Sequence, residues 1–197
     1  MSKESIKNTI SLMLITLIAG LLLGAVYEIT KEPIAKENQR AKEEAYKAVF
    51  ADAGSFEEID LDTDQVQKEL DSQGLDASIN EAMKVLDGSG QQLGYVLTVT
   101  DHEGYGGDIQ FAMGVQSDGT LNGISFLSIS ETAGLGMKAK EDSFRKQFEG
   151  KKVDQIVYTK NGASADNEID ALSGATITTN AVTNGVNAGL YYVHTLQ

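Results

Sequence analysis

The first part of the chain is an unbroken run of apolar positions, and no residue from Asn8 to Tyr27 carries a charge. An α-helix of this length rises about 30 Å, which matches the hydrocarbon core of a bilayer. The run predicts a short tail at residues 1–7 and a single transmembrane helix, surrounded by lipid, at residues 8–28. A cleaved signal peptide is the alternative, but the run is long for one and no clear small-x-small cleavage site follows it.

A polar helix is expected after this run. Thr30 can cap a helix start, Pro33 suits a first turn, and the sequence from Ile34 to Phe50 is rich in Ala, Lys and Glu. The pattern predicts a helical stalk at residues 29–50 and a domain at residues 51–197.

The domain opens with an acidic stretch and then alternates between apolar and polar positions. We expect a loop at residues 51–64 and a short helix around Gln65–Asp71. Residues 87–90 and 117–119 are rich in Asp, Ser and Gly, and each group separates two strand-like segments, which predicts two β-hairpins. Their strands are expected at Ala82–Leu86, Gly94–Thr100, Ile109–Gln116 and Leu121–Ser128.

Helical spacing returns toward the C-terminus. A helix is expected at Glu141–Phe148, a strand at Val153–Tyr158 and a final helix from Ile177 to about Thr195. Spacings of three and four residues place apolar side chains on one face of that last helix: Ala181, Val182, Val186, Leu190 and Val193. The expected fold class is α+β: an antiparallel sheet with packed helices, preceded by one transmembrane helix and a helical stalk.

Composition removes several classes of function. The formal net charge of −13 argues against binding the phosphate backbone of a nucleic acid. The absence of cysteine excludes thiolate and iron–sulfur ligation, and two histidines are too few for a histidine metal cluster. The segment Asp60–Asp64 alternates aspartates as a calcium loop does, but Gln65 stands where that loop needs glycine. A solvated acidic face is therefore expected, and no metal site.

The segment from Asp170 to Thr176 lies directly before the last helix and reads Asp-Ala-Leu-Ser-Gly-Ala-Thr. Backbone N–H groups at a helix start lack partners, and the helix dipole is positive there, so such a place binds phosphate readily. Gly174 permits close approach of the backbone, and Thr176 offers a hydroxyl. On local physics alone, an ordinary Ser or Thr helix cap is the competing interpretation.

This segment resembles the covalent flavinylation motif, Asp-x-x-Ser/Thr-Gly-Ala-Thr, of the FMN-binding domain family. That family includes the G subunit of the Rnf complex and the C subunit of the sodium-translocating NADH:quinone reductase. The resemblance implies that the Thr176 hydroxyl forms a phosphodiester with FMN, which a separate flavin transferase installs from FAD. It also implies that Asp170, Ser173, Gly174 and Ala175 serve recognition by the transferase and shape the phosphate turn.

Two further segments resemble the family. Gly104-Tyr105-Gly106-Gly107 is similar to its Gly-Tyr-Gly-Gly turn, where glycines let the backbone approach a ligand. The segment 131–138 is similar to a Glu-Thr-Pro-Gly-Leu-Gly segment beside the flavin, with Ala133 in place of Pro and Ile129 where many members have His. The resulting cofactor-binding candidates are Tyr105, Gly106, Thr132, Gly134, Leu135, Gly136 and Met137. Leu135 and Met137 either cover the apolar isoalloxazine ring or pack into the core.

The overall layout is most similar to the G subunit of the Rnf complex. The resemblance implies a covalently flavinylated electron-transfer subunit of a membrane, ion-translocating ferredoxin:NAD⁺ oxidoreductase. The isolated chain would carry electrons and turn over no substrate, so no catalytic residue is expected. Implied partners are the other membrane subunits and the flavin transferase. The alternatives are the C subunit of the quinone reductase, a membrane-tethered flavin sensor, and a structural anchor without cofactor.

Charges around the span give a divided prediction of orientation. Lys3 and Lys7 precede the span and favour a cytoplasmic N-terminus, whereas Lys31, Lys36 and Arg40 follow it and favour the opposite. The family resemblance implies a cell-membrane protein with a cytoplasmic N-terminus and an extracytoplasmic FMN domain.

Overall fold

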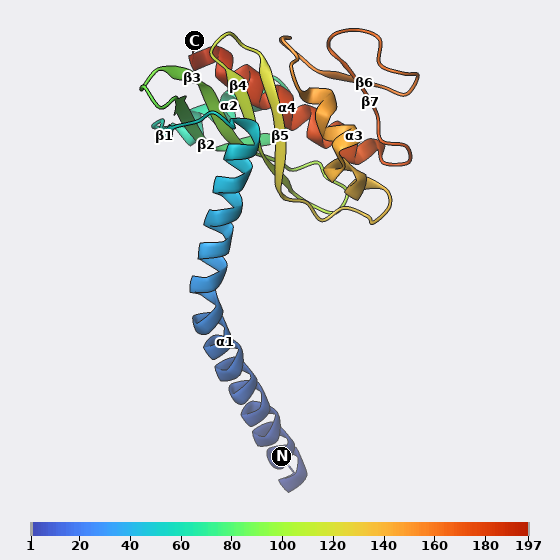
Figure 1. The fold of residues 1–197 in the computed structure, drawn as a ribbon. Coiled ribbons are helices and arrows are strands. Elements are labelled where there is room, and N and C mark those ends of the chain that lie inside the picture. Colours follow the sequence, from blue (N-terminus) through green and yellow to red (C-terminus); the bar gives the residue numbers. More distant parts are fainter. Residues whose placement is uncertain (1, 197) are drawn as a thin grey trace. The chain divides into compact units, whose positions relative to one another are not determined.

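One long helix, α1 (Lys3–Val49), opens the chain (Figure 1). The computed structural model describes residues 2–196, in two compact units that meet between Ala41 and Lys42. The helix begins in the first unit and ends in the second.

The helix expected after the apolar run is confirmed, since α1 continues through Thr30 to Val49, whereas the helix cap expected at Thr30 is wrong. The Thr30 hydroxyl donates to the Val26 carbonyl at 2.9 Å, so it bonds back into the helix and caps nothing. Pro33 lies inside α1. Because proline has no N–H, the helix lacks the one hydrogen bond that would run from residue 33 to the Ile29 carbonyl.

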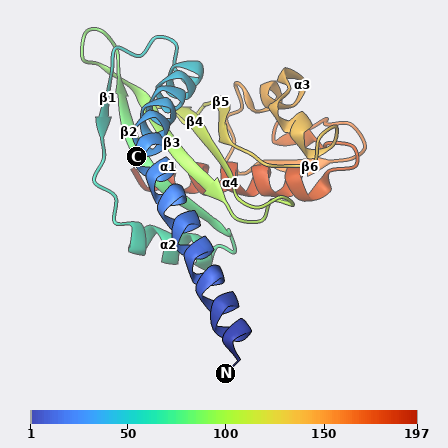
Figure 2. The same ribbon diagram turned by 90° about the horizontal axis from the view of Figure 1, so that it is seen from below.

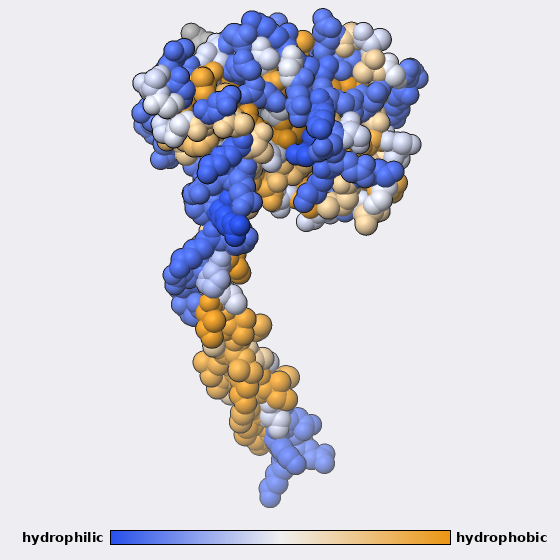
Figure 3. Space-filling model, in the orientation of Figure 1, coloured by the Kyte–Doolittle hydropathy of each residue, from blue (hydrophilic) through white to orange (hydrophobic). Residues whose placement is uncertain are grey.

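The first unit is the part of α1 that ends at Ala41, and its apolar side chains are exposed. Figure 3 shows them as an orange band between blue polar ends. Within residues 2–196, α1 is the one helix long and apolar enough to cross a membrane, and no residue of its most apolar stretch is buried by protein. An uncovered apolar surface of this length is suited to lipid.

The second unit is built on a five-stranded antiparallel sheet with the order β1-β2-β3-β4-β5. Both predicted hairpins are confirmed, one between β2 and β3 and one between β4 and β5. The Asp87 carboxylate stabilises the first turn by accepting from the N–H groups of Ser89 at 2.7 Å and Gln91 at 2.9 Å. The strands are β1 (Ser55–Glu58), β2 (Ala77–Leu86), β3 (Gln92–Asp101), β4 (Ile109–Gln116) and β5 (Leu121–Ser128).

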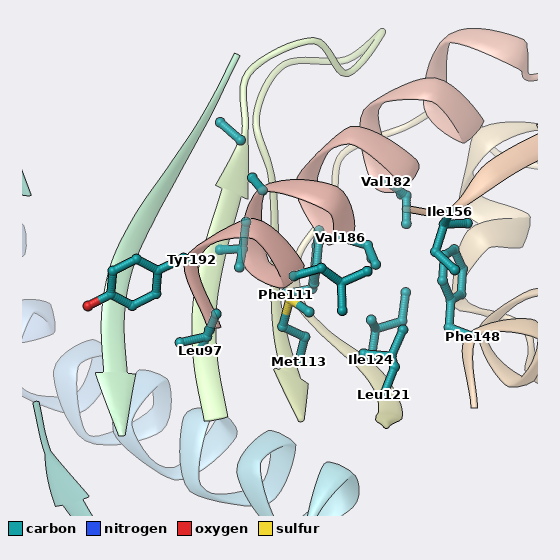
Figure 4. Packing of buried hydrophobic residues seen from close by; sticks show 14 of the residues in the cluster. Leu97, Phe111, Met113, Leu121, Ile124, Phe148, Ile156, Val182, Val186 and Tyr192 are labelled. Atoms are coloured by element: carbon teal, nitrogen blue, oxygen red, sulfur yellow. The ribbon is translucent and has the colours of Figure 1, made fainter. Parts of the chain in front are cut away.

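Helix α4 (Thr176–Leu196) covers one face of the sheet and packs on β2, β3 and β4 (Figure 2). In Figure 4, Phe111 and Met113 of β4 lie beside Val186 of the helix, and Val182 lies beside Ile156. The predicted C-terminal helix is therefore confirmed, and all five residues of its predicted apolar face are buried. Together with the antiparallel sheet, it confirms the α+β class.

The last turns of α1, which belong to the second unit, cover the opposite face. Val49 and Phe50 pack with Val96 and Ala112 in a second apolar cluster. This double cover explains why β3 and β4 read as nearly continuous apolar runs, since alternate side chains face opposite layers.

Tyr46 anchors these turns of α1 with a polar contact. Its hydroxyl donates to Glu81 Oε2 at 2.7 Å and lies 2.7 Å from the Thr98 hydroxyl. Burial and the hydrogen bond to Glu81 raise the pKa of the Tyr46 phenol, which therefore stays protonated.

Two predictions for the rest of the domain are wrong. Residues 51–64 contain the edge strand β1, because Phe56 packs against the Tyr46 ring at a centroid distance of 5.5 Å. The strand expected at Val153–Tyr158 is instead the shorter β6 (Val157–Thr159). Ile156 is withdrawn from strand pairing because the Asn187 side chain bonds both its N–H, at 2.7 Å, and its carbonyl, at 2.9 Å.

The remaining elements connect the sheet to α4. The predicted short helix is α2 (Thr63–Ser72), with Asp62 as its N-cap. The helix expected at Glu141–Phe148 is divided into α3 and a 3-10 turn, η2, and a further 3-10 turn, η1, precedes it. Strand β7 pairs with β6 in parallel and leads into the segment before α4. Their bounds are η1 (Gly136–Lys140), α3 (Asp142–Arg145), η2 (Lys146–Phe148) and β7 (Glu168–Asp170).

Candidate functional site

An open cavity of about 540 Å³ lies where three segments meet: the turn after β3, the loop after β5 and the first turn of α4. This volume is within the range of small-molecule sites. Most of the residues predicted from the three motifs come together here, although the segments are far apart in the sequence. The lining residues are Tyr105, Glu131, Thr132, Leu135, Gly136, Gly174, Ala175, Thr176, Ile177 and Thr178.

The first turn of α4 carries free backbone donors. The first helical bond runs from the Thr179 N–H to the Ala175 carbonyl at 3.0 Å. Ala175 thus occupies the N-cap position, and it has no side-chain oxygen to cap the helix. Within residues 2–196, no protein acceptor bonds the N–H groups of Thr176, Ile177 and Thr178. Three free donors at the positive end of a long helix form a place for an anion.

The three threonine hydroxyls of this turn differ in their hydrogen bonding. Thr178 Oγ1 donates to Glu131 Oε2 at 2.7 Å, and Thr179 Oγ1 donates to the Ala175 carbonyl at 2.9 Å. Thr176 is half-buried at the cavity wall, and its hydroxyl has no hydrogen-bond partner in the described part of the chain. Of these three threonines, Thr176 therefore has the hydroxyl that is available for chemistry.

The turn before α4 exposes this end of the helix. Gly174 has φ = +76°, a conformation that residues with a side chain rarely adopt. A Cβ atom built there would lie 3.2 Å from Leu135 Cδ2, so a larger residue would also narrow the cavity.

Glu131 joins the three segments, and the sequence prediction did not include it among the site residues. Its side chain is 8% exposed. Oε1 accepts from the Gly106 N–H at 3.0 Å, and Oε2 accepts from the Thr178 hydroxyl. The predicted residue Gly106 thus contributes to the site through this bond, although it does not line the cavity.

Exposed apolar side chains surround the cavity. Leu135 is 42% exposed, Ile177 51% and Tyr105 70%. Ile177 was not predicted as a site residue, because nothing in the sequence distinguishes a single apolar residue in the first turn of a helix from apolar residues elsewhere in a helix. Leu135, for which two roles were open, is not packed into the core, so the wall suits a flat apolar ligand.

Besides Gly106, four further predicted residues do not line the cavity. Asp170 lies at the end of β7, where its carboxylate accepts from the Ala163 N–H at 2.7 Å. Ser173 is exposed, and Gly134 forms a turn with φ = +77°. Met137 is half-buried, and its N–H donates to the Thr132 carbonyl at 3.2 Å, which closes the loop behind Leu135.

A buried acid supports the turn that carries Tyr105. Asp101, at the end of β3, is fully buried, and its Oδ1 accepts from the Glu103 N–H at 2.9 Å. Its Oδ2 has no hydrogen-bond partner among residues 2–196. Burial, with smaller contributions from the charges of Glu103 and Asp76, raises the pKa of Asp101 to about 7. The Asn184 side chain donates to Glu103 Oε2 at 2.7 Å and ties the same turn to α4.

These features fit a phosphorylated aromatic cofactor. The free N–H groups and the Thr176 hydroxyl suit a phosphate, and the apolar wall suits a flat ring. No group of three or more His, Asp or Glu side chains with metal-ligand geometry occurs among residues 2–196.

Comparison with known proteins finds two family models along the chain. The RnfG N-terminal region matches residues 1–49, and the FMN-binding domain matches residues 104–191, which contain every lining residue of the cavity. The G subunit of the proton-translocating ferredoxin:NAD(+) oxidoreductase complex of Clostridium ljungdahlii is 30% identical over 99% of this chain and 97% of its own length. The chain belongs to the RnfG family.

Other relatives agree with this membership. The G subunit of the Na(+)-translocating ferredoxin:NAD(+) oxidoreductase complex of Acetobacterium woodii is 30% identical over 99% of this chain and 94% of its own. The crystal structure of the C subunit of the Na(+)-translocating NADH-quinone reductase from Parabacteroides distasonis is 20% identical, with a TM-score of 0.50 over 72% of this chain and 78% of that chain, and shares the fold. This RnfG-family chain is thus a membrane-associated, FMN-binding electron-transfer subunit of an oxidoreductase, as the sequence motifs implied.

Proposed function

We propose that this chain holds one FMN covalently on Thr176 and relays electrons within an ion-translocating ferredoxin:NAD⁺ oxidoreductase complex. The observation that carries the proposal is the first turn of α4, where three N–H groups without protein acceptors adjoin the uncommitted Thr176 hydroxyl. The C. ljungdahlii and A. woodii relatives, which belong to such complexes, support the reaction class.

In the attachment step, Thr176 Oγ1 replaces AMP at the FMN phosphorus of FAD. One O–P bond forms, the pyrophosphate bond breaks, and AMP and the hydroxyl proton leave. A separate flavin transferase carries out this step. Asp170, Ser173, Gly174 and Ala175 supply the segment that the transferase recognises, and the position of Asp170 at the end of β7 suits contact with that enzyme better than contact with the bound phosphate.

The chain's own residues then hold the cofactor. The N–H groups of Thr176, Ile177 and Thr178 bind the phosphate, and the side chains of Leu135 and Tyr105 cover the ring. FMN, when bound, supplies one- and two-electron transfer, and the protein fixes its position and adjusts its potential.

The covalent bond suits the proposed location. Residues 8–28 span the cell membrane with the N-terminus in the cytoplasm, and the FMN domain faces the extracytoplasmic side. A cofactor bound reversibly on that side would be lost by dilution, whereas an ester-linked one is retained. The other subunits of the complex donate and accept its electrons.

The proposal is tested by co-expressing the full chain with a flavin transferase and looking for flavin fluorescence on the denatured protein band. We expect fluorescence from the wild type and from Thr176→Ser, and none from Thr176→Ala. Thr179→Ala is the matched control in the same helical turn, because Thr179 does not line the cavity, and it should retain the fluorescence. Fluorescent Thr176→Ala protein would contradict attachment at this hydroxyl, and a dark wild type would contradict covalent flavin altogether.

A further inference from the structure

The cavity wall contains one buried carboxylate, that of Glu131, whose contacts differ from those of the other acids in the domain. It accepts one bond from the turn after β3, through the Gly106 N–H, and one from α4, through the Thr178 hydroxyl. Those two donors are separated from Glu131 by 25 and 47 residues of sequence. A single side chain of the loop after β5 thus fixes the spacing of the other two segments that form the cavity.

The surroundings of this carboxylate leave it no room to move. A Cβ atom on Gly136 would lie 2.6 Å from Glu131 Oε2 and 2.5 Å from Thr178 Oγ1. On the other side, a Cβ atom on Gly104 would lie 3.1 Å from Glu131 Oε1 and 2.8 Å from Ile109 Cγ1. Both glycines therefore make space for the carboxylate, which is held in one position.

The charge of Glu131 has no cationic partner in the described part of the chain. Its two bonds come from a backbone N–H and a hydroxyl, and no Lys or Arg of residues 2–196 forms an ion pair with it. Among the described residues that line the cavity, it is also the one with a formal charge. Because Glu131 is only 8% exposed, its unpaired charge acts more strongly on its neighbours than it would at the surface.

We propose that Glu131 is a positioning residue for the flavin and that its negative charge holds the reduction potential of that flavin low. This inference rests on the proposed function. Each electron that enters the ring adds one negative charge, and each proton that follows from water removes one. The nearby carboxylate opposes the added charge, so reduction is less favourable than it would be beside a neutral side chain of the same shape.

Glu131→Gln separates charge from position. The amide oxygen accepts from the Gly106 N–H, and the amide NH₂ donates to the Thr178 hydroxyl oxygen, so both connections remain while the charge is lost. Glu131→Ala removes both connections. Glu141→Gln is the matched control, because Glu141 is exposed, lies outside the cavity lining and makes no side-chain cap to α3.

The test uses the full chain in detergent after co-expression with the flavin transferase. Flavin loading of the wild type is measured first, so a failure of the proposed function is seen separately. The midpoint potential is then measured by spectroelectrochemical titration with mediator dyes. We expect Glu131→Gln to load like the wild type and to show a more positive midpoint potential, and Glu141→Gln to show none of this shift. A loaded Glu131→Gln protein with the wild-type potential would overturn the proposal.

The positioning role has a test that needs no cofactor. In the unflavinylated Thr176→Ala background, hydrogen exchange at the Gly106 N–H should accelerate in Glu131→Ala and stay slow in Glu131→Gln. Equal exchange rates at the Gly106 N–H in Glu131→Ala and its parent would show that the bond to Glu131 does not hold this turn in place, and would overturn the proposal. With Thr176 intact, a Glu131→Gln chain that takes up no flavin, although the amide still protects Gly106 in the Thr176→Ala background, would also overturn the proposal, because the charge would then serve attachment and not the potential.

Discussion

The first turn of α4 and the body of the same helix lie in opposite surroundings. The body of the helix is buried on the sheet, and Gly185 lets it approach so closely that a Cβ atom there would lie 2.9 Å from the Phe111 ring. The first turn instead faces an open cavity, with three unpaired N–H groups and the exposed side chain of Ile177. One helix thus provides the rigid core and a reactive end.

This difference has a physical cause in a few residues. Ala175 supplies no capping oxygen where most helices have one, so the donors of the first turn stay available. The body has no such freedom, because its side chains are packed at the density of a protein interior. Rigid packing of the body keeps the first turn in position. We therefore expect substitutions against the body to change the stability of the domain, and a substitution at the first turn to change flavin loading as well.

The largest effect is expected from overpacking the body with Gly185→Val. The added methyl groups would overlap the Phe111 ring, which is fully buried and cannot move away. We expect the free energy of unfolding to fall by about 3 kcal/mol, measured by urea denaturation. Gly88→Ala is the control, since a Cβ atom there meets nothing within 4 Å, and its cost should be much smaller. Equal losses in both variants would contradict the close packing of the body.

A smaller effect, dependent on pH, is expected at Asp101, which faces the body of α4. Its pKa is about 7 in the folded protein against an ordinary value of 3.8, so between these pH values the folded state binds more protons than the unfolded state. The free energy of unfolding contributed by this group therefore falls as the pH rises from about 4 to 7.

Asp101→Asn removes this titration. Between pH 5.5 and pH 8, we expect the wild type to lose about 2 kcal/mol more stability than the variant, as measured by urea denaturation at each pH. Asp118→Asn is a useful comparison, because hydrogen bonds to the Thr120 N–H and side chain lower the pKa of that exposed carboxyl. Parallel pH profiles of Asp101→Asn and the wild type would contradict the burial of an uncompensated acid beside α4.

The smallest effect sharpens the comparison most, because it has opposite signs in two measurements. Ala175→Ser supplies the missing cap, so the unflavinylated domain should gain about 1 kcal/mol of stability. The same hydroxyl occupies donors that the phosphate is proposed to use, so flavin loading by the transferase should fall. An equal substitution in an exposed turn away from the cavity, Ala51→Ser, should change neither quantity. A capped helix that loads flavin as well as the wild type would show that the phosphate does not need these donors.

Features encoded locally were predictable from the sequence. The apolar spacing of α4, the glycine-rich turns of both hairpins and the chain from Gly174 to Thr176 each lie within a few neighbouring residues. The prediction at Thr30 was wrong because a cap and an internal hydroxyl bond use the same residue type.

Features that depend on contacts between distant residues were not predictable. Glu131 meets Thr178 across 47 residues, and neither residue alone indicates that contact. Asp101 looks like a polar residue at a strand end, and only the cover of α4 makes it buried. Strand β7 is three residues long, too short for an alternation to appear in the sequence.

The most direct test of covalent flavin at the start of α4 is mass spectrometry of the protein from membranes of the host that makes it. No Lys or Arg lies between Lys160 and Thr176, so trypsin releases Thr176 in a peptide that begins at residue 161, and fragmentation can distinguish Thr176 from the other threonines within it. We expect a peptide that carries one FMN as a phosphoester on Thr176. An unmodified peptide, or FMN on another residue, would contradict the proposed attachment.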